Sequence, residues 1–164
     1  RSTLFPYTTL FRSRTGQELV VDTALVSTYA ASEDYPSTDF IYGLIDQLKS
    51  YITSQSAKET SAPMLNITTT DSVKYLTRVA IPVDKILQSS GNIAYRWMLG
   101  GGNILVCEVK GGPSSVDKAT RQIQYYMSDH RRIAPAIPFQ SLITDRRNET
   151  DTSKWITKIY YPVI

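Results

Sequence analysis

Two nine-residue segments of this chain are nearly the same. Tyr75 to Val83 reads YLTRVAIPV and Trp155 to Val163 reads WITKIYYPV, so seven of nine positions are identical or chemically equivalent. Two copies of a long repeat do not fit a solenoid, whose units are shorter and need at least three copies to bury a core. We therefore expect a single domain made of two related halves, at about residues 20–84 and 92–164.

The likeness extends upstream of these segments. QLKSYI at 47–52 precedes QIQYYM at 122–127 by 75 residues, and Ala62-Pro63-Met64 precedes Ile137-Pro138-Phe139 by the same interval. Two elements thus repeat in one register, which indicates a pseudo-twofold domain. We expect a cleft where the halves meet, because small-molecule sites tend to form in such places.

The first thirteen residues, RSTLFPYTTLFRS, resemble the translation of a sequencing-library adapter. We expect residues 1–13 to be non-native and the domain to occupy residues 14–164, with a possible further domain missing upstream. Arg1 and Arg12 fall in this stretch. Without them 16 basic residues face 15 acidic ones, and the net charge falls from +3 to +1.

The distribution of charge and the composition limit the classes of partner that this chain is expected to bind. Basic and acidic residues are interspersed, as where Glu149 and Asp151 follow Arg146-Arg147, whereas nucleic-acid-binding domains concentrate their basic residues on one face. No run approaches the roughly 18 to 20 apolar residues that span a bilayer. We expect a cytoplasmic domain without direct nucleic-acid or membrane contact, and the single Cys107 permits no internal disulfide.

The first half reads as strand, helix and hairpin. A β-rich run at Ala24 to Ala30 precedes a helix that begins near Ser37. Met64 to Thr70 and Tyr75 to Val83 then predict a hairpin around Asp71-Ser72. Apolar residues at helical spacing predict the buried helix face: Ile41, Leu44, Ile45, Leu48 and Ile52.

The second half repeats this plan. Ile93 to Leu99 and Ile104 to Lys110 flank a glycine-rich segment at 100–103, which predicts a second hairpin. Ser114 with Asp117 resembles a capping box at the start of a helix. The inner face of that helix is predicted to contain Val116, Ala119, Ile123, Tyr126 and Met127.

Strands at Phe139 to Thr144 and Trp155 to Val163 complete the second β-α-β-β unit. Two such units predict an α+β fold, with a mostly antiparallel sheet and two helices on one face.

Several residues that often perform chemistry are better explained structurally. His130 lies with Arg131 and Arg132 at a helix end that favours cations. Cys107 alternates with Leu105 and Val109 and is expected to be a small buried hydrophobe. The triple glycine at 100–102 lacks the helix and Lys-Ser/Thr pair of a phosphate loop. We expect no metal, no cofactor and no catalytic residue among these.

Polar and aromatic residues on strands are the better candidates for a ligand site. Glu108 and Lys110 alternate away from the apolar face of their strand, and ordinary solvated charges remain an equal alternative for both. Lys158 shares a face with Tyr160, and its repeat partner is Arg78. Flat amphipathic rings suit an organic ligand. The candidate binding residues are Lys158, Tyr160, Arg78, Glu108 and Trp97, with a core role as the alternative for Trp97.

These features resemble the GyrI-like family, the effector-binding domain of AraC-type and MerR-type bacterial regulators. The resemblance covers residues 24–164 and depends on the duplicated plan, on Gly111-Gly112-Pro113, and on the run from Thr157 to Pro162. It implies a domain that binds small, often cationic or hydrophobic molecules, either alone or fused to a helix-turn-helix, which is not visible here. Some similar stand-alone members hydrolyse reactive electrophiles.

Two positions depart from the family pattern. Lys158 replaces the acidic residue that usually precedes the I-Y-x-P ending, and Ser114 replaces a frequent aromatic residue after Gly-Pro. A basic pair of Lys158 and Arg78 should favour neutral or anionic small organic molecules, unless Glu108 neutralises it. The loss of the carboxylate also removes the obvious general base. Small-molecule binding is therefore the leading prediction, with a hydrolase using Glu108 or Lys158 and a protein-interaction domain as alternatives.

Overall fold

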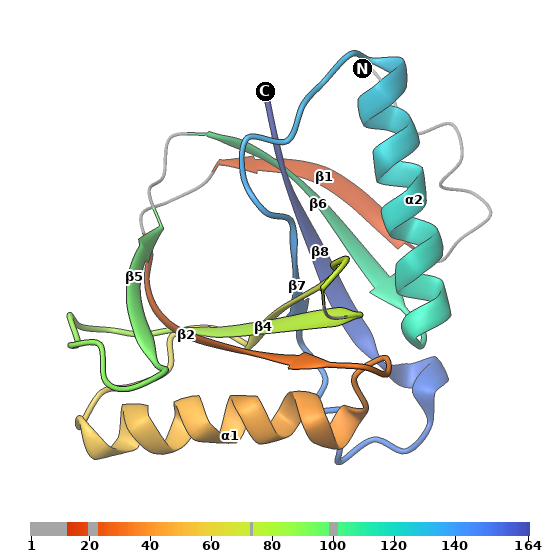
Figure 1. The fold of residues 1–164 in the computed structure, drawn as a ribbon. Helices are drawn as coiled ribbons and strands as arrows, with labels where there is room; N and C mark the ends of the chain where they lie inside the picture. Colours follow the sequence, from red (N-terminus) through yellow and green to blue (C-terminus); the bar gives the residue numbers. More distant parts are fainter. Residues whose placement is uncertain (1–12, 20–22, 73, 99–101) are drawn as a thin grey trace. The chain divides into compact units, whose positions relative to one another are not determined.

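The computed structural model describes residues 13–19, 23–72, 74–98 and 102–164 (Figure 1). Contacts divide the chain into two compact units. We call Val21–Gly100 the first unit, and Arg1–Val20 together with Gly101–Ile164 the second unit.

The first unit contains four antiparallel strands and one helix (Figure 1). Its strands lie in the order β3-β4-β2-β5. The elements are β2 (Thr23–Ser32), α1 (Thr38–Ser54), β3 (Met64–Thr69), β4 (Tyr75–Pro82) and β5 (Ala94–Met98). The predicted hairpin of β3 and β4 is confirmed, with Met64 opposite Ala80 and Thr69 opposite Tyr75.

The helix of the first unit begins at a side-chain cap. Ser37 accepts a hydrogen bond from the backbone N–H of Phe40 at 3.1 Å, and Asp39 adds a negative charge to the first turn. All five predicted face residues are buried, and Tyr42 joins them. The helix packs on β2 and β4, where Val26 and Ile81 are fully buried.

The second unit has the strand order β1-β6-β8-β7, again antiparallel. Its elements are β1 (Ser13–Leu19), β6 (Asn103–Lys110), α2 (Pro113–Asp129), β7 (Phe139–Leu142), the 3-10 turn η1 (Thr152–Lys154) and β8 (Ile156–Val163). The sequence β6-α2-β7-β8 repeats β2-α1-β3-β4, and each set of three strands is completed by one more strand. The predicted α+β class with antiparallel pairing is confirmed.

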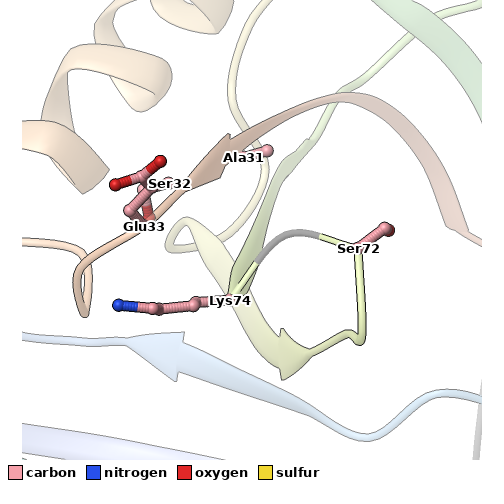
Figure 2. A pocket seen from close by; sticks show the side chains of 5 residues that line it. All are labelled: Ala31, Ser32, Glu33, Ser72 and Lys74. Atoms are coloured by element: carbon pink, nitrogen blue, oxygen red, sulfur yellow. The ribbon is translucent and has the colours of Figure 1, made fainter.

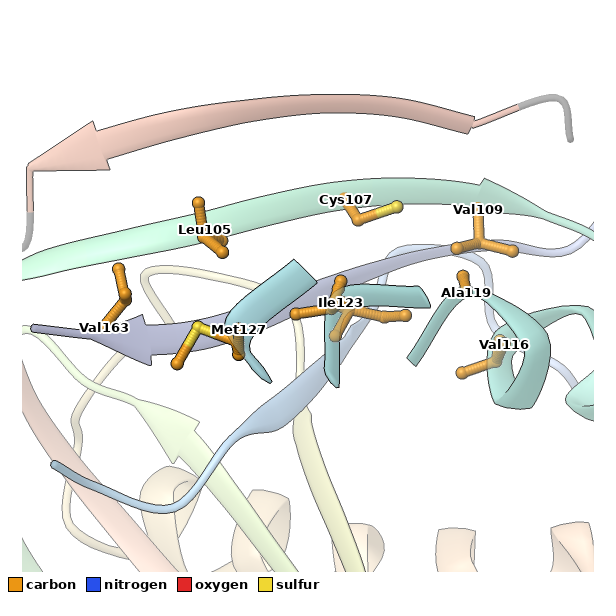
Figure 3. Packing of buried hydrophobic residues seen from close by; sticks show 9 residues of the cluster. Leu105, Cys107, Val109, Val116, Ala119, Ile123, Met127 and Val163 are labelled. Carbon is orange, nitrogen blue, oxygen red and sulfur yellow. The ribbon is translucent and has the colours of Figure 1, made fainter. Parts of the chain in front are cut away.

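The core of the second unit lies between α2 and its sheet (Figure 3). Every second residue of β6 faces the helix, and Ile159 and Val163 of β8 join them. Tyr126, which was predicted on the inner face of the helix, is partly buried and packs against this cluster. The members are Leu105, Cys107, Val109, Val116, Ala119, Ile123, Met127, Ile159 and Val163. Cys107 is thus a buried hydrophobe, as predicted.

The prediction of a hairpin across the glycine-rich segment is wrong. β5 pairs with β2 of the first unit, and β6 pairs with β1 and β8 of the second. Of the glycines at 100–102 only Gly102 lies among the described residues. A flexible turn between two apolar runs permits a hairpin but does not require it, and here the segment connects the two units.

The predicted capping box at Ser114 and Asp117 is also wrong. Gly112 is the N-cap of α2 and makes no side-chain hydrogen bond, while Pro113 occupies the first helical turn. Gly111 has a φ of +141°, and a Cβ there would lie 2.5 Å from the Ser115 hydroxyl. The Gly-Gly-Pro sequence therefore starts this helix by backbone conformation.

Repeat-related threonines have different surroundings in the two units. Thr157 of β8 is fully buried, and its hydroxyl accepts a hydrogen bond from Arg146 at 3.0 Å. Arg146 is itself buried and lies 4.9 Å over the Trp155 ring. The equivalent Thr77 of β4 is also fully buried, but its hydroxyl has no hydrogen-bond partner in the part of the chain that the structure describes.

Truncation in the α2 core should be costly. Ile123 is 2% exposed within the cluster, so Ile123→Ala should lower the free energy of unfolding by about 2 to 5 kcal/mol through lost burial and a residual cavity. Tyr125 on the same helix is 68% exposed, and Tyr125→Ala should change it by no more than about 0.5 kcal/mol. Urea unfolding measures both; equal losses would contradict this core.

The two threonines provide a second test of the packing. Thr157→Val removes one acceptor of a buried guanidinium and should destabilise by about 1 to 3 kcal/mol. Thr77→Val removes a buried hydroxyl that has no partner, so it should be neutral or stabilising. The substitutions are identical and occupy equivalent strands, so thermal melts of the pair compare the two surroundings directly. A larger loss for Thr77→Val would refute this difference.

Candidate functional site

One face of the second unit's sheet points away from α2. Side chains alternate along a strand, so residues next to the α2 core members in β6 and β8 belong to the opposite face. We call this the α2-distal face. In three neighbouring strands it contains Val106, Glu108, Phe139, Ser141, Lys158 and Tyr160.

Lys158 lies at the centre of this face. Its strand, β8, is flanked by β6 and β7, and Lys158 is opposite Glu108 on one side and opposite Ser141 on the other. The lysine is half-buried, Ser141 is buried and Glu108 is exposed. Among the described residues Lys158 makes no hydrogen bond and no ion pair, although Glu108 is its direct cross-strand neighbour.

Tyr160 continues the same face two residues further along β8. It is opposite Val106 in β6 and Phe139 in β7. The rings of Phe139 and Tyr160 are nearly parallel, at 10°, with their centroids 5.0 Å apart. That separation is about the spacing of adjacent strands and too short for rings side by side in one plane. The two rings therefore stack face to face across the strands.

Arg78 occupies the equivalent place in the first unit. It lies on β4 between Tyr29 of β2 and Asn66 of β3. Unlike Lys158 it is engaged, because its guanidinium donates to the Asn66 side-chain oxygen at 3.3 Å and to the Thr68 hydroxyl at 3.1 Å. The two predicted basic residues thus occupy equivalent strand positions, but they differ in their side-chain hydrogen bonds.

Trp97 does not share a face with Arg78. It is opposite Ala24 on β2, next to Leu25, which is on the Arg78 face. Strand alternation therefore places Trp97 on the side of the sheet that α1 covers, at an edge strand, with 51% of the residue exposed. The structure brings together Lys158, Tyr160 and Glu108 on one face of the second unit, whereas Trp97 belongs to the first unit and lies there on the face opposite to Arg78.

The remaining candidates lie outside this centre. Lys110 is exposed on the α2-distal face at the end of β6. His130 is the C-cap of α2, stacks on Tyr126 at 4.0 Å and places its Nδ1 2.9 Å from the Tyr126 carbonyl oxygen, so its predicted place at the helix end is confirmed. Within the described ranges no cluster of three His, Cys, Asp or Glu residues could hold a metal ion.

The loop before β8 is fixed by local hydrogen bonds. Asp151 accepts from the Ser153 hydroxyl at 2.6 Å and from its backbone N–H at 3.0 Å, and these bonds hold the pKa of Asp151 below its ordinary value. The Trp155 indole donates to the Glu149 carbonyl at 2.7 Å. A lowered carboxylate pKa means that this support is present at neutral pH and is lost as the pH falls through that value.

A pocket lies elsewhere, in the first unit (Figure 2). Its volume is about 480 Å³, and Figure 2 shows Glu33 at the end of β2 and Lys74 at the start of β4 beside it. None of the predicted site residues lines it. Its lining consists of Ala31, Ser32, Glu33, Ser72 and Lys74, and it includes no aromatic or large aliphatic side chain.

Sequence reasoning missed Phe139 and Ser141 as parts of the site. Both were expected on a strand, and alternation puts them on one face. Their position beside Tyr160 and Lys158 depends on the pairing register of β7 with β8, which the repeat does not specify.

No known family model and no curated protein sequence matches this chain. Solved structures do match. The crystal structure of the EcmrR C-terminal domain has a TM-score of 0.77 at 16% identity, covering 94% of this chain and 99% of that one. In an EcmrR–DNA complex the chain matches at a TM-score of 0.75 and spans only 57% of the longer EcmrR chain.

Two further structures share the fold. A hydrolase from Listeria innocua matches with a TM-score of 0.67 at 9% identity, covering 92% of both chains. SAV2435, solved with bound tetraphenylphosphonium, matches with a TM-score of 0.58 at 14% identity, covering 92% of this chain and 94% of that one. At these identities the likeness establishes a common fold. Neither helix among the described residues is long and apolar enough to cross a membrane.

Proposed function

We propose that this chain is a GyrI-like small-molecule-binding domain whose ligand contacts the α2-distal face of the second unit. The observation that carries the proposal is Lys158, a half-buried base on an inner strand that has no partner among the described residues. A partly exposed ammonium group can attract an anionic group from solution. A bound ligand is the natural partner.

The structural likenesses support a sensor role. EcmrR has been solved on DNA, and its C-terminal domain shares this fold. We infer that this domain serves as the effector-sensing part of a transcription regulator or acts as a stand-alone binder. We also infer that the two units arose by internal duplication, because they share both their order of elements and the sequence repeats.

The charge of the site determines the kind of ligand. SAV2435 binds tetraphenylphosphonium, a lipophilic cation. Here Lys158 would repel such a molecule, and like charges brought together at a binding surface cost several kcal/mol. We therefore propose a neutral or anionic organic ligand.

Hydrolysis is the second candidate function. A Listeria innocua hydrolase shares the fold, and Glu108 and Lys158 are cross-strand neighbours that form no ion pair. A carboxylate that is not engaged by the adjacent ammonium could act as a general base toward water. Glu108 is exposed, so water can reach its carboxylate directly.

A charge reversal tests the binding function. Wild-type protein should be stabilised by anionic or neutral compounds in a thermal-shift screen, by about 2.7 kcal/mol at a hundredfold excess over Kd. Lys158→Glu should lose the response to anions and gain one to lipophilic cations, because the charge at the centre of the face is inverted.

Lys118→Glu is the matched control, since Lys118 is exposed on α2 and far from the α2-distal face in the fold. It carries the same change of net charge and should keep the wild-type ligand preference. No shift with any compound in wild type, or an equal switch in both variants, would contradict the proposed site.

Hydrolysis has its own test. If the chain is a hydrolase, turnover of an electrophilic ester should fall by about 100-fold or more in Glu108→Gln, because the general base is lost. Ligand-induced stabilisation should persist in that variant. Lys110→Met, a charge change at the end of the same strand, is the control. Unchanged turnover in Glu108→Gln would exclude this residue as the base.

A further inference from the structure

We propose that the ligand of the α2-distal face is an aromatic carboxylate, bound with its ring over the Phe139–Tyr160 stack and its carboxylate at Lys158. This inference rests on the proposed binding function and specifies the chemistry of that site. The carrying observation is the juxtaposition of two stacked rings with an ammonium group that has no partner among the described residues, on adjacent positions of two strands.

The stack determines which part of the rings a ligand meets. Side chains stand roughly perpendicular to a sheet, and these two rings cover one face of each other at 5.0 Å. The outer edge of Phe139 is therefore a hydrogen edge directed away from the sheet, whereas the outer edge of Tyr160 carries its hydroxyl. An aromatic ring has a positive edge and a negative face. The edge of Phe139 thus favours the face of an aromatic ligand over a cation.

The lysine determines the second part of the ligand. Lys158 and Tyr160 are two residues apart on β8, which places their Cα atoms about 6.6 Å from each other along the strand. Both belong to the same face. A ring above Tyr160 and an anionic group two to three bonds from that ring match this separation, within the reach of a flexible lysine side chain.

The neighbours of Lys158 position the anion. Glu108 on β6 repels a carboxylate, whereas Ser141 on β7 offers a hydroxyl that makes no hydrogen bond to another described residue. A carboxylate on the β7 side of Lys158 can accept from both the ammonium and the hydroxyl. Bonds to a charged group are stronger than neutral ones. The same side of β8 carries Phe139, so ring and carboxylate converge between β7 and β8.

The experiment uses three matched probes on the full chain: 3-phenylpropanoate, 3-cyclohexylpropanoate and 3-phenylpropylammonium. Titration calorimetry should show that 3-phenylpropanoate binds at least about tenfold more tightly than each of the others, because only it has both the aromatic face and the negative charge. Lys158→Met should weaken its binding by about tenfold to a hundredfold, while Lys158→Arg should retain most of it.

Phe139→Leu tests the stack, and Lys118→Met on α2 is the control for net charge. Phe139→Leu should bring 3-phenylpropanoate down to the affinity of its cyclohexyl analogue, and Lys118→Met should change neither. Thermal melts without ligand establish that each variant is folded, and Tyr160→Leu replaces Phe139→Leu if that variant is not.

The possible results distinguish failure of the aromatic-carboxylate inference from failure of the proposed binding function. Equal binding of both acids, still dependent on Lys158, would overturn the aromatic preference and leave the proposed binding function intact. Binding of the ammonium probe in preference to the acids would overturn the inference at Lys158. Absence of binding by these probes and by a broad panel of anionic and neutral compounds would overturn the proposed function as well.

Discussion

The register of β8 between its two neighbours is the constraint on which the second unit depends. Thr157, Ile159 and Val163 face α2, and the residues between them face away. A slip by one residue would expose that apolar set and would bury Lys158 under the helix. The burial of Ile159 and the hydrogen bond from Arg146 to Thr157 both oppose such a slip. The same interactions that form the core thus place Lys158 and Tyr160 on the other face.

The sequence predicted the order of helices and strands along the chain, but it did not predict which strands pair when they are distant in sequence. Helix faces such as the one around Ile123 follow from a 3.6-residue period, and the hairpin of β3 and β4 follows from adjacency along the chain. β5 and β1 could not be assigned in this way. Each completes a sheet by pairing with a strand distant in sequence, and no local pattern near Gly102 specifies that partner. The start of α2 was predicted wrongly for a related reason. The polar residues around Ser114 are compatible with a capping box, and they are equally compatible with a helix that starts at Gly-Gly-Pro.

The same limit applies to the candidate site: positions along one strand could be predicted, and the pairing between strands could not. Alternation along single strands correctly grouped Lys158 with Tyr160, since both belong to β8. Grouping them with Phe139 and Ser141 required the β7–β8 register. Trp97 was chosen for its ring alone, and ring type does not tell which side of a sheet a helix covers. Side-chain hydrogen bonds could not be predicted from the sequence either. Arg78 and Lys158 therefore appeared equivalent, although Arg78 donates to Asn66 and Thr68.

Equivalent polar positions of the two units differ in their side-chain hydrogen bonds, and this difference favours a ligand site in the second unit. In the first unit the base on the inner strand has partners, and the threonine beneath the helix has none. In the second unit Arg146 pairs with Thr157, and Lys158 on the inner strand has no partner among the described residues. An unpaired hydroxyl under a helix costs stability but binds nothing from solution, whereas an unpaired ammonium beside stacked rings presents a charge that an incoming anion can satisfy. The same strand plan can therefore hold its inner-strand base in two ways, because Arg78 donates to Asn66 and Thr68 while Lys158 makes no hydrogen bond or ion pair to another described residue, and the second arrangement is the one that the proposed ligand would use.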